Sequence, residues 1–386
     1  MIAHCPVCGS AQLETLYPDH EGDCVTSDMK VLPASTLKNC LCEGCGLIFN
    51  AGGTRGKTEE FYRSSYNLMM RDPNAAIVSF AGKNPVSQAE RTFHILRDLI
   101  DLPSSGRILE AGAGKGDFLG HFVDDCPGWK IDAFEPSEAF TVLSERHPDA
   151  TVDRCEYRDW PRQDEPYDLV VALGVLEHVE NPYDMMVWAN GLLSEGGIFY
   201  VRVPHFANNP NDLFCADHLS KLTEPTLRSL AAASGFEVVG VKEAGVPIFI
   251  MLRKIDLPNQ QFACVADENR EIAERNMDIA RGTIEAILCA RETAHRRGER
   301  FGIFGLGASG LFAPMLHEFP ASEITAYIDE NQSVWGGTIH GRPIAGLDII
   351  SSRDIKRVAL AISPAYFEKV SAKLRDAGVD VYVAEI

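Results

Sequence analysis

The segment "RILEAGAGKGDFLGHF", residues 107–122, constrains the fold of this chain more than any other stretch. Its apolar start predicts a short strand, and Gly112, Gly114 and Gly116 predict a loop that leads into a helix. Such a loop lets the backbone pass close to a ligand near the amino end of the helix. The segment therefore predicts an α/β fold with a ligand site at the edge of a parallel sheet.

An acidic residue follows this loop where the next strand should end. Glu135 closes the apolar segment "IDAFE" nineteen residues after Gly116, and Pro136 comes directly after it. An acidic side chain at the tip of the second strand can accept hydrogen bonds from both hydroxyls of a ribose. The bound ligand is thus expected to contain a ribose.

Further segments continue the alternation of strands and helices. "YDLVVAL" and "GGIFYVRV" predict buried strands, and "GFEVVGVKEAG" with "VPIFIMLRK" predicts an antiparallel hairpin. Residues 265–300 predict a long helix, after which "FGIFGLGASG" repeats the strand, glycine loop and helix. A chain of 386 residues exceeds what one hydrophobic core supports, so two or three domains are expected.

The cysteines gather at the start of the chain. "CPVCG" and "CEGCG" place Cys5 with Cys8 and Cys42 with Cys45, and paired turns of this kind supply the four thiolates of a tetrahedral zinc site. Four unrelated cysteines are the alternative, and Cys40 or His4 could replace one ligand. The set leaves no open coordination position, which favours a structural ion. The 33 residues between the pairs are expected to fold over the site.

Charge and hydropathy narrow the classes of partner. The formal net charge of −19 disfavours nucleic acid, because binding to phosphates needs clustered Lys and Arg. No apolar run is long enough to cross a membrane, and the first residues lack a signal peptide pattern. We therefore expect a cytoplasmic protein, monomeric or homodimeric, that acts on a small molecule.

Residues 107–255 resemble class I S-adenosylmethionine-dependent methyltransferases. The resemblance rests on "LEAGAGKGDFL", "FEPS" and "LGVLEHVENP". An NAD-binding Rossmann domain is the alternative, disfavoured because Glu110 precedes the glycines. The resemblance implies that the glycines hold the methionine part of S-adenosylmethionine and Glu135 its ribose. The remaining cofactor-binding residues that it implies are Glu110, Pro136, Cys155, Glu156 and, more loosely, Tyr157.

The second glycine loop, with Gly305, Gly307, Gly310 and then Asp329, matches a dinucleotide fingerprint. Binding of NAD, docking of a nucleotide-linked substrate and simple packing all remain open for it. The order of the parts resembles the three-domain sugar C-methyltransferases. That resemblance implies an amino-terminal zinc module over residues 1–85, a methyltransferase domain over 86–258, and a long helix with a smaller Rossmann-like domain over 259–386. It also implies a nucleotide-linked keto-sugar as acceptor, and a zinc module that shapes the substrate pocket.

Methylation of a carbon next to a ketone needs a base that removes a proton. The family motif Tyr-x-Glu-His corresponds to Cys215, Ala216, Asp217 and His218, so His218 is the predicted base and Asp217 its orienting acid. His178, in "LEHVENP", is the rival base, and His205 is a third candidate. Tyr62 and Tyr66 are expected to reach the pocket from the zinc module.

The chain departs from the family in two places. The tyrosine of the motif is lost at Cys215, and "AGVPIFIML" stands where the family carries His-Gly-Gly. An O-methyltransferase acting on a small metabolite therefore remains an alternative. An RNA base methyltransferase with a zinc finger and a non-catalytic scaffold are the other two.

Overall fold

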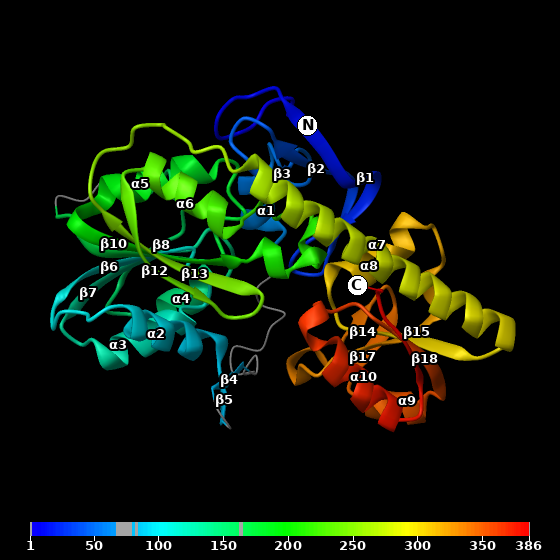
Figure 1. Cartoon of the computed structure of the whole chain (residues 1–386). Coiled ribbons are helices and arrows are strands. Elements are labelled where there is room, and N and C mark those ends of the chain that lie inside the picture. The colour runs from blue at the N-terminus through cyan, green and yellow to red at the C-terminus, as the bar shows by residue number, and fades with distance from the viewer. Residues whose placement is uncertain (1, 67–78, 82–83, 162–164, 386) are drawn as a thin grey trace.

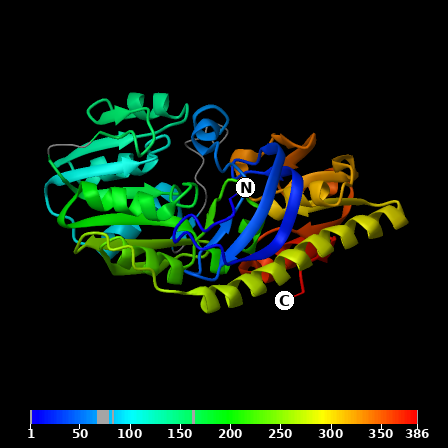
Figure 2. The ribbon, with the colours of Figure 1, turned by 90° about the horizontal axis from the view of Figure 1, so that it is seen from above.

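The computed structural model describes residues 2–66, 79–81, 84–161 and 165–385. A seven-stranded sheet and a six-stranded sheet form two separate α/β units (Figure 1). The amino-terminal hairpin lies between these two units, and one long helix starts beside the seven-stranded unit and runs along the hairpin and the six-stranded unit (Figure 2). The seven-stranded unit, the amino-terminal hairpin and the six-stranded unit therefore lie next to one another.

The larger sheet has the strand order β12-β13-β10-β9-β6-β7-β8. β13 is antiparallel to both of its neighbours, whereas the strands from β10 to β8 are parallel. The strand order switches direction at β6, which pairs with both β7 and β9, and ligands bind at such a point in open α/β sheets. The strands are β6 (Gly106–Ala111), β7 (Trp129–Phe134), β8 (Thr151–Asp153), β9 (Tyr167–Leu173), β10 (Leu193–Pro204), β12 (Phe236–Glu243) and β13 (Pro247–Lys254).

Helices cover both faces of this sheet, which explains why its central strands are mainly apolar. One face packs against Phe93 and Leu96 of α2 (Gln88–Leu99) and against Phe122 of α3 (Asp117–Asp125). The other face packs against Met186 and Leu230 from two later helices. The helices are α2 (Gln88–Leu99), α3 (Asp117–Asp125), α4 (Phe140–Arg146), α5 (Pro182–Leu192) and α6 (Glu224–Ala233).

The amino-terminal module is built on a long antiparallel hairpin that the sequence pattern did not predict. β1 (Leu13–Val25) and β2 (Val31–Cys42) pair from Leu13 opposite Cys42 to Val25 opposite Val31. Its sheet has the order β1-β2-β3-β11, and its last strand comes from the middle of the chain. The other elements are β3 (Ile48–Asn50), α1 (Thr58–Ser64), β4 (Ser79–Ala81), β5 (Asn84–Val86) and β11 (Ser220–Lys221).

The carboxy-terminal unit follows the predicted long helix, α7 (Ala266–Arg297), which ends at Gly298 in a left-handed conformation. Its sheet has the order β16-β17-β15-β14-β18-β19, and it again switches direction at the strand before the glycine loop. The elements are β14 (Arg300–Phe304), α8 (Ala308–Leu316), β15 (Ile324–Ile328), β16 (Thr338–Ile339), β17 (Arg342–Ala345), α9 (Asp348–Ser352), β18 (Ile355–Leu360), α10 (Phe367–Asp376) and β19 (Asp380–Tyr382).

One hydrophobic cluster joins all three parts. It contains Leu16 and Leu37 of the hairpin, Phe214 of the loop after β10, Ile284 of α7 and Phe312 of α8. The parts are therefore held together by a shared apolar core as well as by polar contacts. The predicted domain boundaries at 85/86 and 258/259 stay predictions, and β11 shows that the first sheet draws on residues beyond 85.

Candidate active site

The first glycine loop connects β6 to α3 with backbone angles that suit glycine. Gly112, Gly114 and Gly116 all have positive φ values, of 65°, 57° and 77°. A Cβ at Gly112 would lie 2.8 Å from the Val175 side chain, and one at Gly116 would lie 2.6 Å from His147. Glycine is therefore required for this tight turn, and the backbone of the loop is left accessible to a ligand.

Glu135, at the end of β7, is fastened to this loop. One carboxylate oxygen accepts a hydrogen bond from the Gly114 backbone N–H at 2.8 Å, and the other accepts one from Ser137 at 2.9 Å. A carboxylate offers about four acceptor positions, so two remain for donors such as ribose hydroxyls. Pro136, which follows Glu135, also lines the cavity at this point.

Two further carboxylates at this edge have buried oxygens without a partner among the described residues, namely Oε2 of Glu110 and Oε1 of Glu156. Burial raises the pKa of Glu110 well above its ordinary value, which the Arg202 guanidinium partly offsets. Burial and the nearby Glu59 raise the pKa of Glu156 to about 7. Buried acceptors of this kind need donors, and a bound ligand can supply them.

A single cavity of about 1660 Å³ connects these groups with the rest of the site. Its lining includes Gly114 of the first glycine loop, and Glu156 and Tyr157 from the segment after β8. It continues past His178 to the second glycine loop at Leu306. Cys155, which was predicted to contact the cofactor, is not among the described residues that line the cavity.

Two predicted catalytic residues, His178 and His218, lie side by side on the cavity wall. Their ring centroids are 4.7 Å apart and their planes are nearly perpendicular. His178 follows β9, and His218 lies in the loop after β10, so both stand at the carboxyl edge of the sheet. His205 is buried, and its ring bonds to Asn208 outside the described cavity wall.

The predicted partner of His218 is wrong. Nδ1 of His218 bonds to the carboxylate of Asp212, a buried residue six positions earlier in the same loop. Burial opposes the charged form of His218, yet the Cys215 and Asp212 side chains raise its pKa well above the ordinary value. Because Asp212 occupies Nδ1, Nε2 is the nitrogen left for the cavity. The sequence motif missed Asp212 because it lies six residues before the histidine, outside the Tyr-x-Glu-His pattern.

Asp217 instead faces the amino-terminal module and His178. Its carboxylate accepts hydrogen bonds from the backbone N–H and the hydroxyl of Ser27, at 2.7 and 2.6 Å. It also accepts one from the Tyr62 hydroxyl at 3.0 Å. Asp217 is fully buried, and although burial raises its pKa, His178 and its other neighbours lower it to about 2.

Tyr62 and Tyr66 reach the pocket from α1 and its end, as the resemblance implied, and both line the cavity. The Tyr62 oxygen lies 2.5 Å from Nδ1 of His178. Burial and Asp217 raise the pKa of Tyr62 well above 10, which keeps its proton on at neutral pH. Sequence reasoning missed Ser27, because a lone serine in an expected loop carries no signal.

Glu177 is a second residue that the sequence analysis passed over. It is 3 % exposed and lines the cavity beside His178, with 3.9 Å between its Oε1 and Nε2 of that histidine. Its Oε2 is buried and has no partner in the described part of the chain. The sequence offered a signal for Glu177, because it directly precedes His178 in "LEH", but only the histidine of that motif was predicted to take part.

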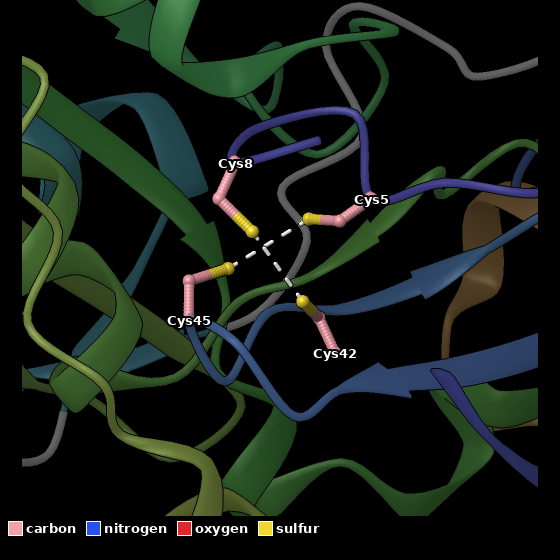
Figure 3. A group of neighbouring side chains, drawn as sticks. All are labelled: Cys5, Cys8, Cys42 and Cys45. Atoms are coloured by element: carbon pink, nitrogen blue, oxygen red, sulfur yellow. Dashed lines mark hydrogen bonds between the residues drawn. The ribbon is translucent and has the colours of Figure 1, made fainter. Parts of the chain in front are cut away.

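The four predicted metal ligands converge (Figure 3). The Sγ atoms of Cys5 and Cys45 are 3.7 Å apart, those of Cys8 and Cys42 are 3.5 Å apart, and all four lie within 4.8 Å of one another. Sulfur ligands at about 2.3 Å from one Zn²⁺ in a tetrahedron would lie about 3.8 Å apart. The cluster therefore fits a zinc ion, and Cys40 and His4 are not part of it.

Two other groups bring possible metal ligands within 4.8 Å: Glu177 with His178 and His218, and Asp212 with Cys215 and His218. Both depend on His218, whose Nδ1 is already bonded to Asp212.

The second glycine loop borders the same cavity. Asp329 accepts hydrogen bonds from the backbone N–H of Leu306 at 3.2 Å and of Asn331 at 2.8 Å. A Cβ at Gly307 would lie 3.1 Å from the amide nitrogen of Asn211, in the loop that carries His218. Ser309 also bonds to Asn211. The loop between β10 and β11, which carries His218 and is called the catalytic loop below, is therefore in direct contact with the second glycine loop.

Comparison with known proteins identifies one part of the chain. Residues 87–241 match the family model described as a methyltransferase domain. No curated protein matches. Solved structures that resemble parts of the chain include a putative S-adenosylmethionine-dependent methyltransferase from Listeria monocytogenes, at 16 % identity and a TM-score of 0.37 over 44 % of this chain and all of that one.

Two others are a possible histamine N-methyltransferase from Thermotoga maritima and a 1,6-didemethyltoxoflavin-N1-methyltransferase from Burkholderia thailandensis. The first has 19 % identity and a TM-score of 0.35, covering 43 % of this chain and 88 % of that one. The second has 20 % identity and a TM-score of 0.36, covering 44 % and 78 %.

The family match falls on the strands and loops that carry the first glycine loop, Glu135 and His178. The larger sheet is thus a class I methyltransferase domain. The chain is therefore an enzyme with a methyltransferase domain over residues 87–241. Among the described helices, none has both the length and the apolar character needed to span a bilayer.

Proposed function

We propose that this enzyme methylates a carbon next to the ketone of a nucleotide-linked keto-sugar. The observation that carries the proposal is the single cavity of about 1660 Å³, which joins the cofactor loop, the two histidines and the second glycine loop. Pockets for one small ligand usually measure about 300–1,000 Å³, so this cavity has room for a cofactor and a large acceptor. The resemblance to three-domain sugar C-methyltransferases supports the same acceptor.

On the cofactor side, Gly112, Gly114 and Gly116 would lie along the methionine part of S-adenosylmethionine. Glu135 would accept from the ribose hydroxyls, and Glu156 from the adenine amino group. The partnerless oxygen of Glu110 is suited to the ammonium group of the methionine. When bound, S-adenosylmethionine supplies an electrophilic methyl group on a sulfonium.

On the acceptor side, the backbone of the second glycine loop would receive the diphosphate. Gly305, Leu306 and Gly307 line the cavity where α8 begins, and the amino end of a helix favours anions. The remaining acceptor positions of Asp329 suit ribose hydroxyls, by the same reasoning as for Glu135. The loop would thus hold the nucleotide while the sugar reaches toward His218.

His218 is the proposed base. In its neutral form Nε2 accepts the proton from the substrate carbon, and the Asp212 carboxylate stabilises the imidazolium that forms. The other buried carboxylate, Asp217, lies 3.6 Å from Nδ1 of His178 and not on the ring of His218. Glu177, with its partnerless oxygen, is placed to accept a hydrogen bond from a sugar hydroxyl.

The zinc ion would be structural, held by Cys5, Cys8, Cys42 and Cys45. The four sulfurs fill a tetrahedron by themselves, so the ion has no position for substrate. Its role would be to hold together the module that brings Tyr62 to the active site.

The test is a methylation assay with methyl-labelled S-adenosylmethionine and a set of nucleoside-diphosphate-linked keto-sugars. We expect a new carbon–methyl bond by NMR, with the nucleotide still attached. Methylation of a hydroxyl alone would show an O-methyltransferase, with His218 as the base for oxygen. Methylation of RNA but of no sugar would overturn the proposal.

A further inference from the structure

The loop that carries the predicted base is held largely by the amino-terminal module. The Ala216 backbone N–H donates to the Val25 carbonyl at 2.8 Å, and the Asn50 side chain donates to the Ala216 carbonyl at 3.1 Å. The Asn39 side chain donates to Leu213 at 2.8 Å, and β11 pairs with β3. The loop after β10 is therefore part of the sheet of another domain.

Asp217 is the centre of this contact. Its two carboxylate oxygens accept from the backbone and hydroxyl of Ser27, from the Tyr62 hydroxyl, and from the Cys215 thiol at 3.2 Å. These four donors fill the acceptor positions that a carboxylate has. Asp217 is 0 % exposed and outside the described cavity wall, so it has no place for a substrate proton.

The contact continues to the second histidine. The single proton of the Tyr62 hydroxyl is donated to Asp217, which leaves the Tyr62 oxygen to accept from Nδ1 of His178 at 2.5 Å. The Asp217 backbone carbonyl also lies 3.0 Å from the same nitrogen. This arrangement favours the His178 tautomer with its proton on Nδ1.

We infer that Asp217 is a positioning residue: its carboxylate fastens the hairpin turn at Ser27 and the Tyr62 ring of the zinc module to the catalytic loop, and thereby sets the tautomer of His178. It does not orient His218, which Asp212 does. The inference concerns the folded enzyme before substrate binds, and it is independent of which acceptor is methylated.

The experiment uses the full-length zinc-loaded protein and requires no acceptor. Asp217→Asn keeps the size of the side chain but converts one acceptor oxygen into a donor. Hydrogen exchange at the Ser27 and Ala216 amides should rise about tenfold or more, the scale for losing a hydrogen bond to a charged group. Asp23→Asn is the matched control, because Asp23 is exposed on the same hairpin and bonds only to the Ala34 backbone N–H among the described residues; it should leave both amides unchanged.

Imidazole NMR supplies a readout that a merely structural role would not move. In Asp217→Asn the nitrogen signals of His178 should shift toward the Nε2-protonated tautomer, while the titration midpoint of His218 changes little. Asp212→Asn should instead shift the titration midpoint of His218 and leave the nitrogen signals of His178 nearly unchanged. Asp217→Glu keeps the charge and should restore the His178 signals in part.

Two outcomes would overturn the inference. One is a titration midpoint of His218 that drops as far in Asp217→Asn as in Asp212→Asn. The other is exchange and His178 signals that remain those of the wild type. If Asp217→Asn fails to fold, Ser27→Ala takes its place, since it removes only the hydroxyl donor; wild-type exchange at Ala216 in that variant would contradict the inference equally.

Discussion

The two glycine loops of this protein share a motif but differ in what surrounds them. Each follows a central strand, opens a helix, and donates a backbone N–H to the acid at the end of the next strand: Gly114 to Glu135, and Leu306 to Asp329. Three glycines of the first loop have positive φ, whereas Gly305 alone does in the second. The two loops thus share the hydrogen bond between a backbone N–H and an acid, but they differ in how many of their glycines have positive φ.

The difference between the loops lies in the side chains at their edges. Beside the first loop stand buried carboxylates without partners and the histidine pair. Beside the second, Gly307 packs against Ala361 and Asn211. A glycine loop therefore predicts a place for a ribose or phosphate, and the neighbouring strand ends decide whether chemistry occurs there.

The largest expected effect tests whether chemistry belongs to the first loop. His218→Ala should lower turnover by roughly 10²-fold to 10⁴-fold, the range for a positioned general base, because it removes the proposed proton acceptor. Calorimetry should show nearly unchanged affinity for S-adenosylmethionine. His178→Ala is the control: if it abolishes turnover while His218→Ala stays near wild type, the base is His178.

The pH profile sharpens the same assignment. A base with a raised pKa is protonated at low pH, so turnover should rise as the pH increases through a midpoint above 6.5. Asp212→Asn removes the charge that supports the imidazolium, so it should move this midpoint to lower pH. Turnover that instead falls as the pH rises through this range would mean that protonated His218 acts as a donor.

A pair of matched substitutions tests the division of labour between the loops. Glu135→Ala should weaken binding of S-adenosylmethionine by about 1.5–3 kcal/mol, the scale for a lost charged hydrogen-bond partner. Asp329→Ala should leave that affinity unchanged. Equal losses of cofactor affinity in both variants would show that the two loops are not specialised.

The amino-terminal module also lines the cavity, through Ser27 and Tyr62, and the zinc proposed for this module should act through Tyr62. We expect about one zinc per chain by metal analysis, and loss of that zinc in a Cys42→Ser, Cys45→Ser double variant. Turnover should then fall about tenfold to hundredfold, because Tyr62 and the catalytic loop lose their support. Full retention of zinc in the double variant would contradict the assigned ligands.

The smallest expected effect concerns the acceptor role of the second loop. Asp329→Ala should raise the KM for a nucleotide-linked acceptor by about tenfold with little change in kcat, since a uniform binding contact is removed. Binding of free nucleoside diphosphate, measured by calorimetry, should weaken in parallel. Unchanged KM together with unchanged nucleotide binding would leave this loop a packing element only.

Much of the fold follows from local patterns in the chain. The strands β6, β7, β9 and β10, the hairpin of β12 with β13, and the long helix α7 lie where hydrophobic runs and glycines predict them. These signals are strong because a strand buried on both faces must be apolar and a tight turn requires glycine. The convergence of the four cysteines was predicted for the same kind of reason, since duplicated CxxCG turns offer one tetrahedral set.

The partners of the active-site residues were decided by tertiary structure alone. Asp217 and His218 are adjacent in sequence, but they lie in an irregular segment before β11, where no local periodicity sets the direction of a side chain. The structure turns Asp217 toward Ser27 and His218 toward Asp212. Ser27 lies 190 residues from Asp217, at the turn of a hairpin whose pairing depends on long-range packing. Residue types and their order thus determined which groups are available, whereas burial and long-range hydrogen bonds determined which of them meet.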